Sequence, residues 1–347
     1  MNLLPSADGW ALARATREVL EREGIAATVR REAGVGATGA RRERMVDLAE
    51  LGVPAVLAPD PHGLGLSCVD ATLVAEEVGR VLLAEPVLDA AVVATALLAA
   101  GGAAGTALAE RILAGHVVAA FDPAPSDLAV VAEPLPPDVL LAPAPDRRSL
   151  RVHAVLGDPA DVDDMDPTRP RVSRRLRDLP VVDEIEIEGE IEGEIAGPVL
   201  LERASALGRI LRAAELVGAG EVAIATTKVY LGGREQFGRP IGAFQAVQHQ
   251  LASAWSGLQA ARACVRAAAA AWDSRDRDAH ALAAAGSLAA VEAVAVAGER
   301  CLHLHGGMGY AWETGMHLTV RRAEAARRLN GPRHALHAAA LGALAAR

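Results

Sequence analysis

Aromatic side chains and lysines are scarce in this 347-residue sequence. Phe, Trp and Tyr together make up 3% of it, so it lacks the stacking platforms with which proteins bind single-stranded nucleic acid. Lys228 is the only lysine, a bias that indicates a GC-rich genome rather than a mechanism. The formal net charge of −9 at pH 7 argues against non-specific binding to nucleic acid or to an anionic membrane.

Cysteine is also rare, and its spacing excludes two kinds of site. Cys68, Cys264 and Cys301 are far apart and odd in number, and no Cys-x-x-Cys pair occurs. Neither a zinc site nor a disulfide framework is indicated, so we expect buried thiols in a reducing cytoplasm. Met1 to Arg14 shows no basic region followed by an apolar one, so no signal peptide is predicted and the expected location is cytoplasmic.

Familiar catalytic and cofactor motifs are largely missing. No His-Glu-x-x-His or Gly-x-Ser-x-Gly occurs. Residues 34–39 match Gly-x-Gly-x-x-Gly, but a dinucleotide-binding turn needs a buried strand before it, and Thr28 to Ala33 are too charged for one. We predict a loop between helices there. The uncharged stretch Ala90 to Ala109 has the length of a membrane span, but a buried helix pair joined at Gly101-Gly102 explains its Ala- and Gly-rich composition better.

Helical periodicity is present at both ends of the chain. In residues 1–120 we expect helices over Trp10–Glu21 and Arg44–Glu50, a turn over Pro59–Leu66, and then a helix. The apolar face of that last helix comprises Ala71, Val74, Val78 and Val81. From Ala204 onward, long Ala-rich segments predict a helical bundle. These segments are Ala204–Tyr230, Ala243–Trp272, Asp278–His303 and a shorter one ending near Arg328.

The middle of the chain has a different character. Between residues 121 and 200, prolines punctuate short Val/Leu runs, which predicts a small β domain. From Glu184 to Ile195, Glu alternates with Ile or Gly, which is typical of a strand with one acidic face. A solvated face is favoured over a metal site, because carboxylates in a straight row do not converge on one ion. The prediction is a mainly α fold with domains 1–120, 121–200 and 201–347.

The most informative segment is Arg234-Glu-Gln-Phe-Gly-Arg-Pro-Ile241, followed by Phe244-Gln245, in a break between two long helices. An arginine at such a position can donate paired hydrogen bonds to pyrophosphate oxygens. Phe237 can pack against a flat ring such as adenine. Further on, Gly306-Gly307 lets the backbone approach a ligand closely. Taken alone, an arginine at a helix end, a core phenylalanine and a turn explain these residues equally well.

Together with His303-Leu-His-Gly-Gly-Met-Gly-Tyr310, this segment resembles the C-terminal FAD-binding signature of the acyl-CoA dehydrogenase family. The resemblance runs from Leu48 to the C-terminus, and it is thin between Phe121 and Leu200. It implies an N-terminal helical domain, a short central β domain and a C-terminal four-helix bundle, assembled as dimers or tetramers. In that family, the bundle of one subunit holds the ADP end of the FAD seated in its neighbour.

The resemblance also implies roles for individual residues. Arg234 would contact the pyrophosphate, Phe237 would pack near the adenine end and Gln245 would hydrogen-bond the cofactor. His303 stands where many members have glutamine. The cofactor-binding residues so implied are Arg234, Phe237, Gln245, His303, Gly306 and Gly307.

Two departures from the family pattern stand out. The flavin-ring end is normally held by a Thr-rich loop and a Trp-x-Thr loop, yet residues 121–126 match the first poorly and no Trp lies between Trp10 and Trp255. The family's catalytic glutamate lies either just before a glycine near the C-terminus or on the first bundle helix, where this chain has Asn330 and Gly208. Neither residue can accept a proton at useful pH, so no catalytic residue is assigned.

Three glutamates remain possible substitutes for the missing base, namely Glu215, Glu221 and Glu313, although a structural or solvated role is preferred for each. The combination resembles the degenerate subunits of actinobacterial heteromeric acyl-CoA dehydrogenases, several of which act on steroid side-chain CoA thioesters. It implies a second subunit carrying the base, an α2β2 heterotetramer, FAD and an acyl-CoA substrate. The alternatives are an active homomeric dehydrogenase with a relocated base, and a structural protein without FAD.

Overall fold

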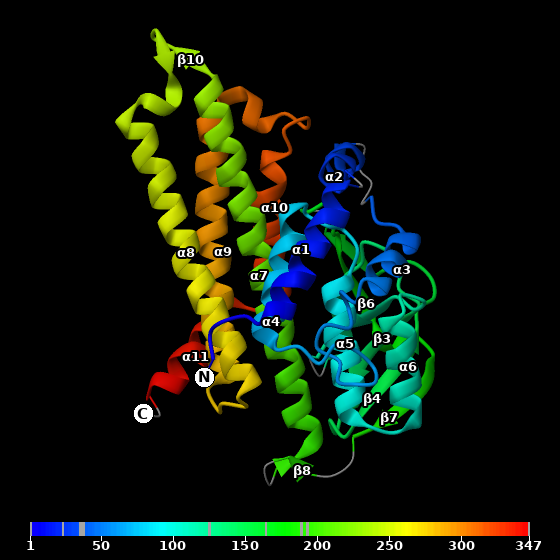
Figure 1. Ribbon diagram of the computed structural model, residues 1–347. Coiled ribbons are helices and arrows are strands. Elements are labelled where there is room, and N and C mark those ends of the chain that lie inside the picture. The colour runs from blue at the N-terminus through cyan, green and yellow to red at the C-terminus, as the bar shows by residue number, and fades with distance from the viewer. Residues whose placement is uncertain are drawn as a thin grey trace.

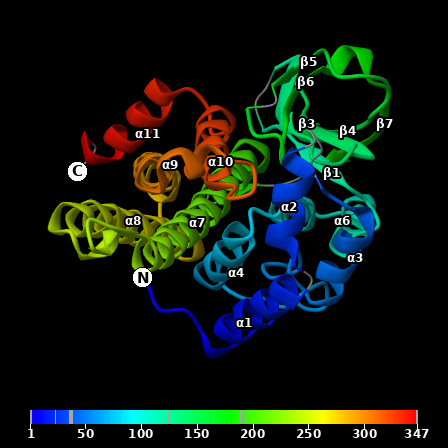
Figure 2. The same cartoon turned by 90° about the horizontal axis from the view of Figure 1, so that it is seen from above.

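The protein is represented by a computed structural model that describes residues 2–22, 24–34, 39–123, 126–163, 165–187, 190–191 and 194–345. Within these residues the fold is mainly helical with a small β unit in the middle of the chain, as predicted. The long C-terminal helices stand side by side, with the N-terminal helices and the sheets to one side of them (Figure 1). Seen from above, the bundle, the N-terminal helices and the β unit occupy three separate sectors (Figure 2).

Among the described residues, six helices precede the first strand. They are α1 (Ala7–Arg22), α2 (Ile25–Gly34), α3 (Arg42–Glu50), α4 (Cys68–Arg80), α5 (Val87–Ala100) and α6 (Ala103–Leu113). Ser67 and Asp70 form a capping box that fixes the start of α4. Gly101 and Gly102 both have positive φ, at 79° and 76°, a conformation that ends α5 and starts α6. The uncharged stretch is therefore two helices joined by a glycine turn, as predicted.

Helix α2 was not predicted, and it bears on the glycine motif that follows it. It covers the charged residues Thr28 to Ala33, so the strand that a dinucleotide-binding turn requires does not precede that motif. Val35 to Thr38, inside the motif, lie outside the described residues.

The β unit consists of two sheets around a small core. Strands β1 (Ala119–Phe121), β3 (Val139–Pro143), β4 (Ser149–Ala154) and β7 (Val181–Glu186) form one sheet, parallel between β1 and β3 and antiparallel elsewhere. Strands β2 (Leu128–Ala132), β6 (Arg171–Arg175) and β5 (Asp161–Asp163) form the other, and the 3-10 turn η1 (Leu176–Asp178) follows β6. Apolar residues of both sheets pack together, namely Ala120, Ala129, Val131, Leu140, Val172 and Leu179.

The predicted acidic strand is interrupted. After β7, residues Glu190–Ile191 (β8) pair antiparallel with Glu194–Ile195 (β9), so the chain turns back on itself. An alternation of period two marks which face a side chain takes and contains no information about where a strand turns. Glu188, Gly189, Glu192 and Gly193 lie outside the described residues.

The bundle is built from five helices. They are α7 (Ala196–Gly233), α8 (Gln245–Asp273), α9 (Ala279–His305), α10 (Met316–Leu329) and α11 (Arg333–Ala345). Helix α7 begins before the predicted start at Ala204, because Pro198 lies in its first turn, where proline is tolerated. The boundary placed at residue 201 therefore falls inside α7, and α11 was not predicted.

Close backbone packing joins the N-terminal helices to the bundle. A Cβ atom at Gly79 on α4 would collide with the carbonyl oxygen of Glu215 on α7, and one at Gly218 on α7 would collide with that of Glu76 on α4. The two helices cross at this point with glycine on each side. Any side chain there would push the N-terminal helices away from α7.

The cysteines and the most apolar helix differ in how far the protein buries them. Cys68 and Cys301 are buried as predicted, but Cys264 is exposed, because it lies on the outer side of α8, a face that periodicity alone did not identify. The stretch Ala279–Tyr310 has the length and hydropathy of a membrane span, yet 56% of its most apolar window is buried within the protein, which suits the central helix of a bundle.

Candidate functional site

A cavity of about 400 Å³ lies where the β unit meets α5, α7 and the end of α10. Both Gly208 on α7 and Asn330 after α10 line it. These are the two positions at which the family resemblance led us to look for a catalytic glutamate. Although 122 residues apart in the sequence, they face one cavity.

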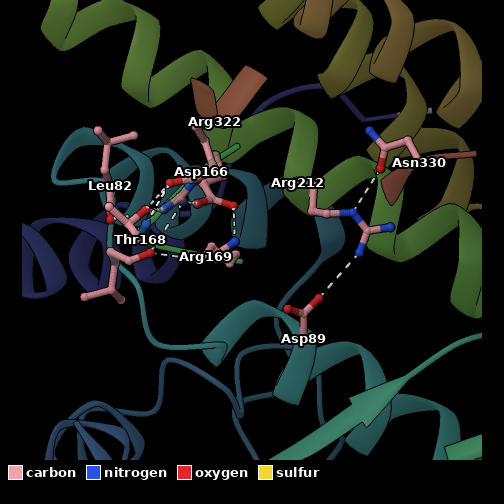
Figure 3. A network of polar contacts seen from close by, with 10 residues as sticks. Leu82, Asp89, Asp166, Thr168, Arg169, Arg212, Arg322 and Asn330 are labelled. Carbon is pink, nitrogen blue, oxygen red and sulfur yellow. Dashed lines mark hydrogen bonds and ion pairs between the residues drawn. The ribbon is translucent and has the colours of Figure 1, made fainter. Parts of the chain in front are cut away.

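The guanidinium of Arg212 fills the space between these two positions. A Cβ atom at Gly208 would lie 3.2 Å from both Nη1 and Nη2 of Arg212. Nε of Arg212 donates a hydrogen bond to Oδ1 of Asn330 at 2.9 Å, and Nη1 reaches Oδ1 of Asp89 at 3.4 Å. Figure 3 shows Arg212 between Asn330 and Asp89. A cation therefore lies between the two positions at which the family resemblance implies a catalytic base.

Both polar atoms of the Asn330 side-chain amide form hydrogen bonds within the protein. Its side chain is buried, with Oδ1 accepting from Arg212 and Nδ2 donating to Oγ of Ser287 at 2.7 Å. The residue caps the C-terminal end of α10. The amide thus holds Arg212 in place and has no capacity to take a proton from a substrate.

Arg209 adds a second positive charge to the cavity wall. It contacts His280 Nε2 through Nη1 at 3.2 Å and the carbonyl oxygen of Asn330 through Nε at 3.4 Å. Burial, together with the charge of Arg212, lowers the pKa of Arg209 to about 10. The pKa of His280 is lowered by burial and by Arg209, so this imidazole stays neutral and accepts the hydrogen bond.

None of the three candidate substitute bases lines the cavity. Glu215 is buried and pairs with Arg169 at 2.9 Å and with Arg322. Its role is structural. Glu221 bridges α7 to α4 and α8 through ion pairs with arginines of those helices. Glu313 is exposed and lines a different cavity, near the end of α9.

Two carboxylates that no sequence motif marks do line the cavity, Asp89 and Asp122. Asp89 is held by Arg212. Asp122 accepts a hydrogen bond from the backbone N–H of Val130 at 2.8 Å. Both carboxylates therefore already interact with other groups of the protein. Phe121, Pro123 and Ser126 of the poorly matching loop also line the cavity, whereas Ala124 and Pro125 lie outside the described residues.

A buried polar network fixes the wall of this cavity (Figure 3). Arg322 on α10 pairs with Asp166 and Glu215 and donates to Thr168 Oγ1 at 2.6 Å. Arg169, which lines the cavity, donates to Glu215 and to the carbonyl oxygen of Leu83. Burial favours a raised pKa for Asp166, but Arg322 and the Thr168 hydrogen bonds outweigh it and hold that pKa below its usual range.

The predicted cofactor-binding residues lie elsewhere, at the end of α7 and α9. After α7, strands β10 (Glu235–Gln236) and β11 (Arg239–Pro240) form a hairpin, and the short 3-10 turn η2 (Ile241–Ala243) leads into α8. Phe237 at the hairpin tip has φ 54° and is 92% exposed. Arg234 and Gln245 are exposed as well.

The glycine motif follows α9 in the 3-10 turn η3 (Gly306–Tyr310). A Cβ atom at Gly306 or Gly307 would meet nothing within 4 Å, and Gly306 has φ 60°. His303 is exposed beside them. The rings of Tyr230 on α7 and His305 on α9 stack with centroids 4.4 Å apart, which ties the ends of the two helices together. The hairpin and η3 therefore lie at the same end of the bundle (Figure 1).

The cavity and this end of the bundle are well separated. Gly208 and Gly233 lie 25 residues apart on the continuous helix α7, which at a rise of about 1.5 Å per residue separates them by about 38 Å. The six predicted residues thus gather near one end of the bundle, and the two glutamate positions gather in a cavity far from it. Among the described residues, no group of His, Cys, Asp or Glu has the arrangement of a metal site.

Comparison with known proteins identifies the family. The family model "Acyl-CoA dehydrogenase, C-terminal domain" matches residues 197–339. The acyl-CoA dehydrogenase IpdE2 of Mycobacterium tuberculosis is 33% identical over 83% of this chain and 82% of its own length. The fold matches the Tcur3481–Tcur3483 steroid ACAD (TM-score 0.79, 23% identity, 97% and 98% of the two chains) and the ChsE4–ChsE5 complex of Mycobacterium tuberculosis (TM-score 0.78, 19% identity, 99% of both chains). The chain belongs to the acyl-CoA dehydrogenase family.

Proposed function

We propose that this chain is a subunit of an FAD-dependent acyl-CoA dehydrogenase in which it supplies the ADP-binding half of an FAD site. A partner subunit supplies the catalytic base, and the two assemble as an α2β2 heterotetramer. The observation that carries the proposal is the position of Arg212. Its guanidinium lies against Gly208 and is hydrogen-bonded to Asn330, so both positions for a base are occupied by cationic or neutral groups.

The chemistry of the family reaction explains why the absence of a carboxylate at these two positions matters. Desaturation of an acyl-CoA begins with removal of the α-proton by a carboxylate held beside the substrate. In this cavity Asp89 is held by Arg212 and Asp122 by the backbone of Val130. Arginine stays protonated at any working pH and cannot serve as the base. The chain therefore needs a second subunit for the proton transfer.

The distance along α7 supports a shared FAD site. The cavity beside the β unit and the Arg234 motif are about 38 Å apart along the helix, which is longer than an extended dinucleotide. One FAD cannot join both within one chain. The end of the bundle would therefore bind the ADP part of an FAD whose ring lies in another subunit, and the bound FAD would supply the hydride-accepting chemistry of the reaction there.

The residues at this end of the bundle fit such a ligand. Arg234 makes no ion pair within the described chain and can donate paired hydrogen bonds to pyrophosphate. Phe237 exposes nearly its whole ring, and an adenine or a neighbouring subunit would cover it. Gly306 and Gly307 have open space in front of their α-carbons, so their backbone N–H groups can approach phosphate or ribose. Gln245 and His303 offer further hydrogen bonds from the same surface.

We further propose a steroid side-chain CoA thioester as the substrate class of the assembled enzyme. The support is the similarity in fold to a protein described as a steroid ACAD. The heteromeric assembly is supported in the same way by the similarity in fold to a two-component complex.

Co-expression tests the assembly. The chain would be purified alone and after co-expression with a candidate acyl-CoA dehydrogenase subunit from a neighbouring gene, with native mass and flavin absorbance measured for each preparation. We expect flavin only in the co-purified complex, with fewer flavins than chains. Bound flavin and turnover by the chain alone would support a homomeric enzyme with a relocated base. Absence of flavin from both preparations would support a structural protein.

The Arg234→Ala variant tests the cofactor-binding residues directly. Loss of a charge-assisted hydrogen bond costs about 1.5–3 kcal/mol, so the complex should retain FAD at least about tenfold more weakly. Arg277→Ala is the matched control, because Arg277 is similarly exposed but lies at the opposite end of α8. Equal flavin affinity in the two variants would contradict the assignment.

A further inference from the structure

Six guanidinium groups and five carboxylates lie in or next to the wall of the cavity around Arg212. Arg171 and Arg328 share Asp163, with distances of 2.9 and 2.5 Å. Arg212 faces Asp89. Arg169, which lines the cavity, and Arg322, which lies behind its wall, pair with Asp166 and Glu215. Asp122 also lines the cavity and accepts a hydrogen bond from the backbone N–H of Val130, so that six arginines, Arg209 included, face five carboxylates among the described residues.

Arg209 is the guanidinium without a carboxylate. Its hydrogen bonds go to the neutral His280 and to a backbone carbonyl oxygen, and no carboxylate of the described chain lies within ion-pair distance of it. Nη2 of Arg209 and Nη2 of Arg212 form no hydrogen bonds within the described residues. Burial and, after it, the nearby charge of Arg212 depress the pKa of Arg209, and an anion between the two guanidinium groups would relieve their repulsion.

The rest of the lining is suited to an apolar group. Pro86 and Val92 from the α5 side, and Val130 and Leu135 from the β unit, face the same cavity. A volume of about 400 Å³ falls within the range of small-molecule pockets, which combine apolar walls with a few convergent polar groups. The cavity therefore matches a ligand with an apolar body and a single negative charge at one end.

We propose that this cavity binds an organic carboxylate, with the carboxylate group on Arg209 and Arg212 and the apolar body against α5 and β2. The fork of N–H donors on a guanidinium matches the two oxygens of a carboxylate. The carboxylate can belong to a free acid or to the far end of an acyl-CoA. The proposal concerns the cavity alone and is independent of the FAD site at the other end of α7.

Calorimetric titration of the purified chain tests the charge preference. Octanoate is the probe and octanamide its neutral counterpart of nearly the same shape. We expect octanoate to bind about tenfold more tightly than octanamide. This factor corresponds to the lower end of the free energy that a charge-assisted hydrogen bond contributes. Equal affinity for the acid and the amide, or no binding of either, would overturn the proposal.

A second pair of probes distinguishes the two sources of the carboxylate. Suberyl-CoA carries a carboxylate at the end of its acyl chain, whereas octanoyl-CoA of the same length does not. Preference for suberyl-CoA over octanoyl-CoA assigns the site to acyl-CoA molecules with a terminal carboxylate. Octanoate binding without that preference assigns it to free acids.

Variants locate the charge preference within the cavity. Arg209→Gln should reduce the octanoate-to-octanamide ratio to less than about twofold, while Arg209→Lys should keep part of it. Arg300→Gln is the control, since Arg300 is also partly buried, lacks an ion pair in the described chain and contacts only the carbonyl oxygen of Gln250. An unchanged ratio in Arg209→Gln with folded protein, shown by an unaltered circular dichroism spectrum, would refute the role of Arg209.

Discussion

Replacing Arg322 should destabilise the fold more than almost any other single change. The Arg322 side chain is 4% exposed and satisfies two buried carboxylates, Asp166 and Glu215. In Arg322→Met the volume is nearly kept, but Asp166 retains only its hydrogen bonds with Thr168, while Glu215 retains Arg169. Removing one partner of a buried ion pair costs about 3–5 kcal/mol, and we expect a loss of that size in the free energy of unfolding.

Denaturant titration at pH 7 measures this loss. Arg321→Met is the control, because Arg321 is the neighbouring residue on α10 and makes only a 3.3 Å hydrogen bond to the carbonyl oxygen of Met165 and a contact with the Trp312 ring. Its substitution should cost no more than about 1 kcal/mol. A loss below about 1 kcal/mol in Arg322→Met would show that the network contributes little to stability.

The pH dependence of the free energy of unfolding supplies an independent check on the contribution of the Arg322–Asp166 pair. The pKa of Asp166 is lowered in the folded protein, so its contribution is complete above the unfolded pKa of about 4 and is lost as pH falls through the folded value. In Arg322→Met the unpaired, buried Asp166 should have a raised pKa, so that variant is penalised most at neutral pH. The difference in stability between the two proteins should therefore begin to narrow above the unfolded pKa of about 4, as Asp166 of the variant takes up a proton, and should continue to narrow down to the lowered pKa of the wild-type group. Asp166→Asn added to Arg322→Met should recover part of the stability, and a gap that stayed constant with pH would refute the reasoning.

Three further outcomes are expected. Phe237→Ala should leave the unfolding midpoint unchanged, because the ring is 92% exposed. It should nevertheless weaken FAD retention by the co-purified complex. A lowered midpoint with intact FAD retention would contradict the assignment of Phe237 to the cofactor site. Asn330→Asp should leave turnover of the complex within about tenfold, since the base is proposed to lie on the partner, and a larger loss with flavin still bound would place this cavity in the reaction. A thiol reagent should label Cys264 in the native protein well before Cys68 and Cys301, both of which are buried with raised pKa values; simultaneous labelling of all three would contradict the packing.

The sequence predicted the helices well where periodicity and punctuation agreed. The face formed by Ala71, Val74 and Val78 is buried in α4, and Gly101-Gly102 separates two helices. The start of α7 was missed because Pro198 reads as a break, although the first turn of a helix tolerates it. The turn between β8 and β9 was missed because strict alternation continues through it.

The sequence predicted only some of the residues that line the cavity. Gly208 and Asn330 were identified from the family pattern, and both line it. Arg209 and Arg212 carry no motif, and their importance depends on which face of α7 they occupy once the β unit is packed against it. Burial of a charge and its distance from another charge are tertiary properties, so the excess positive charge could not be read from residue order.

The network around Arg322 also affects how the chain folds. Arg322 contacts Glu215, Asp166 and the carbonyl oxygen of Leu83 across sequence separations of 107, 156 and 239 residues. Contacts between such distant residues form late, since long loops must close before they contribute, whereas the Ala-rich helices of the bundle can form early from local interactions. We expect a φ-value near zero at Arg322, so that Arg322→Met speeds unfolding and leaves the folding rate nearly unchanged. The cavity wall that includes Arg169 would then be completed only when the N-terminal helices, the β unit and the bundle have all docked, and a ligand of the cavity would bind only fully folded chains.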